Sequence, residues 1–262
     1  MADDLPLPLR VYRGLSSVAA PFAGTLARYR LKKGKEDEAR IEERRGVSGT
    51  ARPDGPLIWI HGASVGEVLA AAGMVERMRA MNIRILLTSG TVTSAAIVAK
   101  RFPSDVIHQF VPYDSPRFVA RFLDHWQPSF ALFVESDLWP NLIMAASERN
   151  VPMIVINGRM SPRSFQRWRA APATMHALLG QFEMCLAQSQ GDADRFSELG
   201  SPHVFNVGNL KFDVPAPPAD PQKLEQLVAA THGRPIVVAS STHQGEEEIV
   251  LDAHRRLASY FP

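Results

Sequence analysis

The stretch Ile58-Trp59-Ile60-His61-Gly62-Ala63-Ser64-Val65-Gly66-Glu67 gives the clearest indication of the fold. Its first residues, with Leu57 before them, are apolar throughout and have the length of a strand. A glycine turn follows, and Glu67 opens a segment with helical spacing. A fully apolar strand that turns directly into a helix is typical of a parallel sheet covered on both faces.

Outward from this stretch, apolar runs of strand length alternate with amphipathic helical segments. We predict strands over Leu57–His61, Ile83–Thr88, Val106–Val111, Phe130–Val134, Met153–Ile156, Met184–Ala187 and Val204–Val207. We predict helices over Glu67–Met81, Thr93–Phe102, Pro116–His125, Pro140–Arg149 and Asp192–Leu199, and a pair within Pro162–Leu179. This alternation predicts an α/β fold with a doubly wound parallel sheet.

The pattern changes between Gly208 and Pro221, where clustered prolines favour a stiff, extended linker. We predict a helix over Gln222–Ala230, a strand over Ile236–Ala239 and a helix over Glu246–Leu257. One strand and two helices cannot enclose a core. We therefore expect residues 214–262 to contain the linker and only the start of a second domain.

The composition is that of a globular protein, with 45% hydrophobic and 21% charged residues. The net charge of +2 is too small to indicate nucleic-acid binding. The single cysteine, Cys185, excludes an intrachain disulfide, and its apolar neighbours predict a buried strand thiol rather than a nucleophile. No cleavable signal peptide is expected, because the acidic start of the sequence lacks the basic residues of such a signal.

Residues 1–45 differ from the rest. Apolar residues recur at helical spacing, and basic residues flank them on both sides. One interpretation is a helix that lies in a membrane interface. The other is an ordinary helix packed on the domain and bent by Pro21. The pattern leaves both open, and we expect Lys35–Arg45 to form a solvated helix of mixed charge. The apolar residues are Val11, Leu15, Val18, Phe22 and Leu26.

Glu67 permits two interpretations. A carboxylate where a strand meets a helix can accept a proton from a substrate hydroxyl, but an acid in the first helical turn is also favoured by the helix dipole. The segment Gly62–Gly66 also matches G-x-S-x-G, the nucleophile elbow of α/β-hydrolases, with Ser64 as the nucleophile. That alternative is disfavoured because the elbow follows the first strand, which leaves no earlier strand to provide the second oxyanion donor.

Three other segments carry polar residues next to predicted strands. Glu135 and Asp137 follow the fourth strand, where Asp137 also fits a helix cap. Lys211 follows the last strand of the first domain and suits a negatively charged leaving group, although a surface lysine near a hinge is the simpler alternative. Ser240–Glu248 is a hydroxyl- and glycine-containing turn before a helix, which favours anions. No spacing of His, Cys or Asp indicates a metal site.

Taken together and in order, these segments resemble the 3-deoxy-D-manno-octulosonic acid (Kdo) transferase family. Any one of them is weak evidence, whereas six in the family's order are strong. Arg30–Arg45 also fits, through its KGKED core (Lys33–Asp37). The six matching pieces are HGASVGE (His61–Glu67), TSGTVTSA (Thr88–Ala95), ESDLWPN (Glu135–Asn141), NGRMSPRS (Asn157–Ser164), GNLKFD (Gly208–Asp213) and SSTHQGEEE (Ser240–Glu248).

The resemblance implies the GT-B architecture of two facing Rossmann-like domains. Residues 1–45 would associate with a membrane, 46–213 would form the complete N-terminal acceptor domain, and 214–262 would begin the domain that binds the CMP-sugar donor. It implies transfer of Kdo from CMP-Kdo to the lipid A precursor, with inversion and without a metal or other cofactor. It also implies a location at the cytoplasmic face of the inner membrane.

Residue by residue, the resemblance implies that Glu67 is the general base and that Glu135 and Lys211 stabilise the transition state. The implied acceptor- or substrate-binding residues are Ser64, Gly66, Asp137, Asn157 and Arg159. The implied donor-binding residues are Ser241, Thr242, His243 and Glu246. The family's later CMP-binding motifs do not occur before Pro262, so we expect little transferase activity from this chain alone.

Two classes of function compete with this one. A non-catalytic acceptor-binding or membrane-associated module would keep the first domain without binding CMP. A nicotinamide-dependent oxidoreductase would need a G-x-G-x-x-G fingerprint after Ile60, which the sequence lacks.

Overall fold

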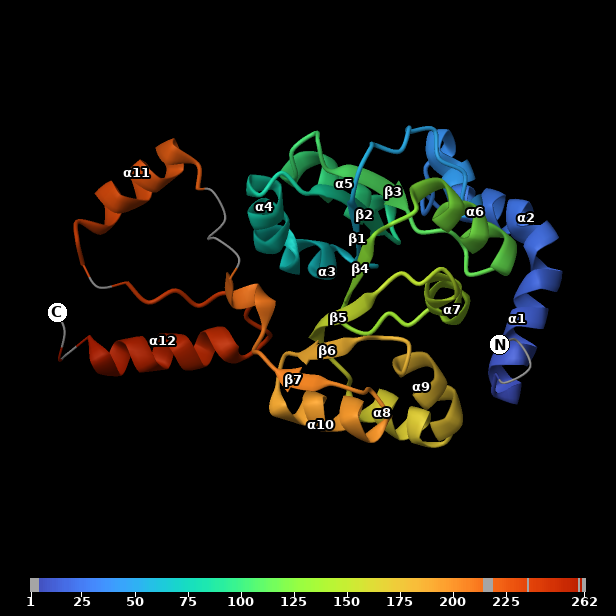
Figure 1. The fold of residues 1–262 in the computed structure, drawn as a ribbon. Helices are drawn as coiled ribbons and strands as arrows, with labels where there is room; N and C mark the ends of the chain where they lie inside the picture. Colours follow the sequence, from blue (N-terminus) through green and yellow to red (C-terminus); the bar gives the residue numbers. More distant parts are fainter. Residues whose placement is uncertain (1–4, 214–218, 235, 259, 261–262) are drawn as a thin grey trace. The chain divides into compact units, whose positions relative to one another are not determined.

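Seven parallel strands form the central sheet of the computed structural model (Figure 1). The structure describes residues 5–213, 219–234, 236–258 and 260. The chain forms two compact units, Met1–Pro215 and Ala216–Pro262. The strands are β1 (Leu57–His61), β2 (Arg84–Ser89), β3 (Ile107–Phe110), β4 (Phe130–Val134), β5 (Met153–Gly158), β6 (Met184–Ala187) and β7 (Val204–Asn206).

The sheet order is β3-β2-β1-β4-β5-β6-β7. The chain starts at the middle with β1, runs outward to β3, returns to β4 beside β1, and then runs outward to β7. The predicted doubly wound α/β sheet is therefore confirmed. The winding reverses between β1 and β4, and in open α/β sheets ligands bind outside the carboxyl ends of the strands at such a switch point.

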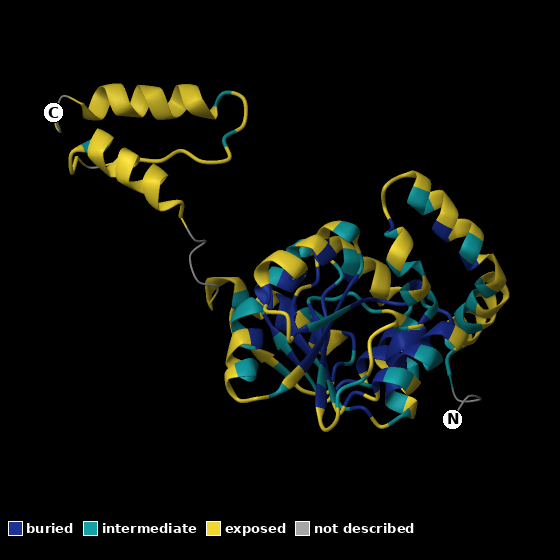
Figure 2. Cartoon of the chain, turned by 90° about the horizontal axis from the view of Figure 1, so that it is seen from above, coloured by how far each residue is buried: buried dark blue, intermediate teal, exposed yellow. Residues whose placement is uncertain are grey.

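Helices cover both faces of the sheet, and alternate strand residues feed two cores. Trp59 and Phe133 face a core shared with α6, α7, α9 and α10, whereas Ile60 and Leu87 face a core shared with α3, α4 and α5. Figure 2 shows the buried residues gathered on this sheet. The helices are α3 (Val65–Ala70), α4 (Ala72–Ala80), α5 (Val92–Arg101), α6 (Pro116–Trp126), α7 (Pro140–Glu148), α8 (Pro162–Arg169), α9 (Pro172–Leu179) and α10 (Gln190–Glu198).

One segment that was predicted as a single helix is divided into two. The segment predicted as Glu67–Met81 forms two helices, α3 and α4, separated at Ala71. The 3₁₀ turn η3 (Leu210–Asp213) approaches this region closely, since a Cβ atom on Gly73 would lie 3.3 Å from the carbonyl oxygen of Asp213. The interruption therefore lies where the last segment of the first unit packs against the helix pair.

The N-terminal segment folds onto the same unit. It comprises α1 (Leu7–Ala19), the 3₁₀ turn η1 (Ala20–Phe22), α2 (Ala23–Lys32) and the 3₁₀ helix η2 (Glu38–Arg45). Pro21 lies in η1, where the helical path is interrupted, because proline removes a backbone donor. No helix among the described residues is long and apolar enough to cross a membrane.

The expectation of a solvated helix over Lys35–Arg45 is wrong. Glu36 and Arg44 are buried, at 6% and 3% exposure, and they form an ion pair at 2.8 Å. Arg30 donates to the other oxygen of Glu36 at 2.6 Å, and Arg44 donates to the carbonyl oxygens of Gly90 and Val111. Because burying a charge requires such partners, opposite charges in this stretch hold the N-terminal segment on the sheet instead of facing water.

The second unit contains two helices, α11 (Pro221–Thr231) and α12 (Glu246–Leu257). Both confirm the predicted helices. The predicted strand over Ile236–Ala239 is not formed, and Val237 and Val238 are 85% and 78% exposed. A strand needs a neighbour to pair its backbone groups, and the described part of this unit offers none.

Candidate functional site

The loop after β1 brings Glu67 back over the end of its own strand. Gly62 makes this turn possible, because a Cβ atom there would lie 3.1 Å from the Val68 nitrogen and 3.2 Å from Glu67 Cβ. Ser64 is the N-cap of α3, and its side chain accepts from the Glu67 N–H at 3.3 Å. The sequence Ser64-x-x-Glu67 therefore forms a variant of the capping box, in which Glu67 reaches back to the Ser64 hydroxyl and to the N–H of Ala63 rather than to the N–H of Ser64.

Both oxygens of the Glu67 carboxylate receive hydrogen bonds. Oε1 accepts from Ser64 Oγ at 2.7 Å, and Oε2 accepts from the Ala63 N–H at 2.8 Å. An ionised carboxylate has about four lone-pair sites, so each oxygen retains one for a further donor. The carboxylate is thus fixed in orientation and remains partly exposed.

Glu135 lies at the end of β4, the strand beside β1. Its φ of 64° falls in the left-handed region, which non-glycine residues rarely adopt and which often marks functional sites. Glu135 Oε1 accepts a hydrogen bond from Lys211 Nζ at 3.1 Å. The Glu135 side chain is 18% exposed and that of Lys211 is 45% exposed, so the pair faces solvent on the lysine side.

Lys211 also lies close to the start of α3. A Cβ atom built on Gly66 would be 4.0 Å from Lys211 Nζ. The structure therefore brings together three segments that are far apart in the sequence: the loop after β1, the end of β4, and η3. Glu67, Glu135 and Lys211 belong to these three segments.

Asn157 holds the third segment in place. It is fully buried at the end of β5, and its Oδ1 accepts from the backbone N–H of Leu210 at 3.0 Å. Its φ of 51° is again left-handed. Since Leu210 precedes Lys211 and packs against the core below α3, this contact fixes where the lysine emerges. Its Nδ2 is buried and has no hydrogen-bond partner among the described residues.

Asp137 is tied to β1 by a contact that sequence reasoning missed. His61 Nε2 lies 3.5 Å from Asp137 Oδ2, and Trp139 Nε1 donates to the same oxygen at 2.7 Å. Burial alone raises the pKa of Asp137, but its contacts with His61 and Trp139 outweigh burial, and the pKa lies below its ordinary value. Asp137 is therefore held as a carboxylate.

The orientation of His61 is set from inside the sheet. Thr88 Oγ1 accepts from Trp59 Nε1 at 2.8 Å and lies 2.9 Å from His61 Nδ1. The Thr88 hydroxyl has two lone pairs and one proton, so it can accept from the indole and either donate to His61 Nδ1 or accept from it. The tautomer that carries its proton on Nε2 presents that proton to Asp137. The sequence signal for this link is the register, since His61 and Thr88 are paired at the ends of β1 and β2.

The remaining predicted residues of the first unit lie apart from these contacts or act locally. Arg159 is exposed after β5 and has no hydrogen bond or ion pair among the described residues. The hydroxyl of Ser64 is engaged with Glu67, and within the described residues it has no histidine partner such as a hydrolase nucleophile needs. Cys185 is fully buried, as predicted, and burial raises the pKa of its thiol to about 12.

The predicted donor-binding residues form an exposed turn before α12 in the second unit. The φ of Ser241 is 57°, the His243 N–H donates to Glu246 Oε2 at 2.8 Å, and Thr242 donates to Glu247 at 2.5 Å. The Thr242 hydrogen bond lowers the pKa of Glu247. No cluster of three or more potential metal ligands occurs among the residues that the structure describes.

Comparison with known proteins gives a consistent result. A family model described as 3-Deoxy-D-manno-octulosonic-acid transferase (kdotransferase) matches residues 39–214. A protein of Rickettsia bellii named 3-deoxy-D-manno-octulosonic acid transferase is 33% identical over 95% of this chain and 60% of its own length. A probable mitochondrial enzyme of that name from Arabidopsis thaliana is 35% identical over 97% of this chain and 59% of its own.

The enzyme of the same name from Haemophilus influenzae is 35% identical over 95% of this chain and 56% of its own length. The chain thus spans 56–60% of these three relatives. Among solved structures, a Neisseria meningitidis UDP-GlcNAc 2-epimerase bound to UDP-GlcNAc matches with a TM-score of 0.49 and 13% identity, over 79% of this chain and 63% of that one.

Proposed function

Since the chain belongs to the 3-deoxy-D-manno-octulosonic acid (Kdo) transferase family, we propose that it transfers Kdo from CMP-Kdo to a hydroxyl of the lipid A precursor in lipopolysaccharide biosynthesis, with inversion. The observation that carries this proposal is the convergence of Lys211 with Glu135 and with Gly66 at the sheet's switch point. Ligands bind at such a point in open α/β sheets.

In the proposed reaction, Glu67 accepts the proton of the attacking hydroxyl. The hydrogen bonds from Ser64 and Ala63 orient its carboxylate and leave a lone pair on each oxygen. The acceptor oxygen forms a bond to the anomeric carbon of Kdo. The bond from that carbon to the phosphate oxygen breaks, and the electron pair leaves with CMP.

Charge of opposite sign develops on the two sides of the breaking bond. Glu135, after β4, and Lys211, after β7, can stabilise one sign each. The carboxylate of Glu135 stabilises the positive charge that grows on the sugar. Lys211, 3.1 Å away and 45% exposed, stabilises the negative charge on the departing CMP. In this mechanism a lysine takes the place of a metal ion, so no metal is required.

We also propose that the protein acts on a membrane surface, at the cytoplasmic face of the inner membrane. The apolar stripe of α1, η1 and α2 points away from the unit, and its five residues are 49–71% exposed. The surface of a soluble protein seldom exposes a row of large apolar side chains, whereas a helix that lies in a membrane interface does. The stripe consists of Val11, Leu15, Val18, Phe22 and Leu26.

The test of the base is Kdo transfer by this chain joined to the C-terminal part of the Haemophilus influenzae relative. We expect Glu67→Gln to lower kcat by about 100-fold or more, because glutamine cannot accept the proton. Glu76→Gln, which changes an exposed carboxylate on α4, is the matched control and should keep full activity. Full activity of Glu67→Gln would refute the assignment of the base and direct attention to Glu135.

A second candidate is an acceptor-binding or membrane-associated module without transferase activity. The observation that favours it is the exposed apolar stripe of α1, η1 and α2, which suits a membrane surface and requires no transfer chemistry. An inert joined wild type that still binds lipid A precursor would support this candidate.

A further inference from the structure

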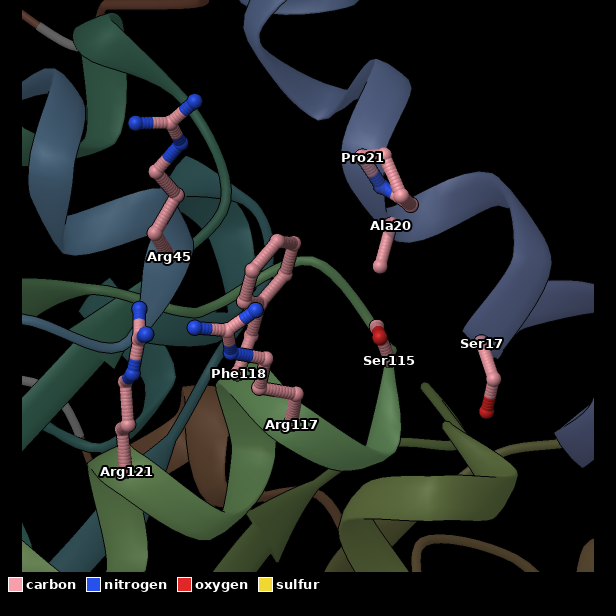
Figure 3. A pocket seen from close by; sticks show the side chains of 8 residues that line it. All are labelled: Ser17, Ala20, Pro21, Arg45, Ser115, Arg117, Phe118 and Arg121. Carbon is pink, nitrogen blue, oxygen red and sulfur yellow. The ribbon is translucent and has the colours of Figure 1, made fainter.

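A pocket of about 500 Å³ lies between the N-terminal segment and α6 (Figure 3). Ala20 and Pro21 of η1 line one side, and Arg117 and Arg121 of α6 line the other. Arg45, at the end of η2, completes a set of three arginines. None of its described lining residues is acidic, so the pocket is strongly positive.

Two of the three guanidinium groups are available. Arg117 and Arg121 make no hydrogen bond or ion pair with the residues that the structure describes. Arg45 donates from Nη1 alone, to Glu42 Oε1 at 3.1 Å and to Glu42 Oε2 at 3.5 Å. A guanidinium presents five N–H donors in a planar fork that matches the oxygens of a phosphate. The cluster therefore has many donors and few acceptors of its own.

Ser115 gives an independent indication of an anion. It is the N-cap residue of α6, an 11-residue helix, yet its hydroxyl makes no capping bond. The side chain is buried, at 4% exposure for the residue, and its Oγ has no partner among the described residues. Buried hydroxyls are normally hydrogen-bonded, and a helix N-terminus attracts negative charge. A phosphate oxygen would satisfy both requirements.

The nearby apolar residues indicate where the anion comes from. The turn η1 that lines the pocket also carries Phe22, and Val18 lies one residue after the lining residue Ser17. Phe22 and Val18 are 68% and 71% exposed. A free anion makes no contact with exposed apolar side chains, whereas a membrane lipid places a charged headgroup beside an apolar layer that such side chains can enter.

We propose that this arginine pocket binds the phosphomonoester headgroup of a membrane lipid. Three arginines and one hydroxyl suit a group that carries more than one negative charge. The inference rests on the membrane-surface part of the proposed function, and it adds a headgroup site that is separate from the Glu67 site.

The experiment is vesicle co-sedimentation of the full chain. Phosphatidylcholine vesicles are doped either with phosphatidic acid, a phosphomonoester, or with enough phosphatidylglycerol, a phosphodiester, to match its surface charge. We expect the wild type to prefer phosphatidic acid by about tenfold and Arg117→Gln/Arg121→Gln to lose that preference. Arg77→Gln/Arg101→Gln, which removes two exposed arginines from α4 and α5, is the matched control and should keep the preference.

Several outcomes would overturn the proposal. Equal losses in the two double variants would mean that net charge alone drives binding. No preference between the two anionic lipids would exclude headgroup recognition. If the wild type shows no preference for phosphatidic acid, yet millimolar inorganic phosphate stabilises only proteins with an intact pocket against heat, the pocket takes a free anion. Circular dichroism melts verify that both double variants are folded.

A further variant separates this inference from the proposed attachment to membranes. Val18→Ser/Phe22→Ser removes two apolar side chains of the stripe and should weaken binding to all vesicles. If the wild type binds no vesicles at all, attachment itself fails. If it binds them without distinguishing phosphatidic acid, only the pocket inference fails.

Discussion

Glu67 combines two functions in one side chain. Its carboxylate accepts from the Ser64 hydroxyl and the Ala63 N–H at the start of α3, and it is also the proposed base. The two interpretations that the sequence left open are therefore compatible, because the cap uses one lone pair on each oxygen and leaves the others for substrate. The Ser64 hydroxyl, which the hydrolase alternative requires as a nucleophile, is part of the same cap.

His108 gives a prediction about pH at the residue scale. Its Nδ1 lies 3.0 Å from the Arg40 guanidinium, which can only donate, and its Nε2 lies 2.9 Å from Ser89 Oγ. Burial, together with the charges of Arg40 and Arg44, lowers the pKa of His108 to about 3. The folded protein therefore keeps this ring neutral.

An unfolded histidine has a pKa of about 6.5, so below that pH the unfolded state takes up a proton that the folded state refuses. The free energy of unfolding should fall by on the order of 1 kcal/mol between pH 6.5 and pH 5 because of this residue. His108→Gln should flatten that slope in urea titrations, and His203→Gln, an exposed control, should not. An unchanged slope in His108→Gln would show that this residue is not the source of the acid sensitivity.

At the scale of residues, the sequence alone indicates which residues belong to the candidate site, but it does not indicate which hydrogen bonds they make. Glu67, Glu135 and Lys211 stand at strand ends, which periodicity can locate. The buried polar links cannot be found in this way, because they depend on register and on side-chain direction. Substrate binding by Asn157 stays a prediction, and nothing in the sequence indicates that its Oδ1 accepts from Leu210. His61 was not singled out, and it contacts Asp137.

At the scale of elements, Gly46 decides how the N-terminal segment meets the domain. Its φ is 76°, and a Cβ atom there would lie 2.0 Å from the carbonyl oxygen of Phe118 on α6. Gly46→Ala should therefore destabilise the protein by about 2 kcal/mol or more. Gly49→Ala, where a Cβ atom meets nothing within 4 Å, should change stability by less than about 0.5 kcal/mol.

Urea unfolding of the two glycine variants measures the difference. Equal stability would mean that η2 and α6 separate easily and that the close approach at Gly46 does not matter. Because Arg45, which lines the arginine pocket, directly precedes Gly46, a destabilised Gly46→Ala should also lose the preference for phosphatidic acid.

Strands were predictable where burial on both faces makes a run apolar throughout, and β1, β4 and β6 have the predicted bounds. The strand over Ile236–Ala239 has the same composition but does not form, because pairing depends on a neighbour and not on composition. The burial of Glu36 and Arg44 was missed for a related reason: a mixed-charge run gives no sign of which charges find partners inside.

At the scale of the whole molecule, the proposed catalytic residues belong to the first unit and the proposed donor-binding turn to the second. Neither helix of the second unit, α11 or α12, has a buried residue, so we expect this unit to hold the donor weakly. The 262-residue chain should then show less than about 1% of the Kdo transfer of the chain joined to the C-terminal part of a relative, since rate depends on holding donor and acceptor together. Radiolabelled transfer to lipid A precursor measures both. Comparable rates would mean that the chain holds the donor unaided.

The sole thiol of the sequence, Cys185, lies in β6, and a Cβ atom on Gly158 of β5 would come within 2.8 Å of its sulfur. Packed this tightly, the sulfur is closed to an alkylating reagent until β5 and β6 part. The rate at which iodoacetamide modifies Cys185 therefore reports on how often β5 and β6 separate, and no label has to be engineered.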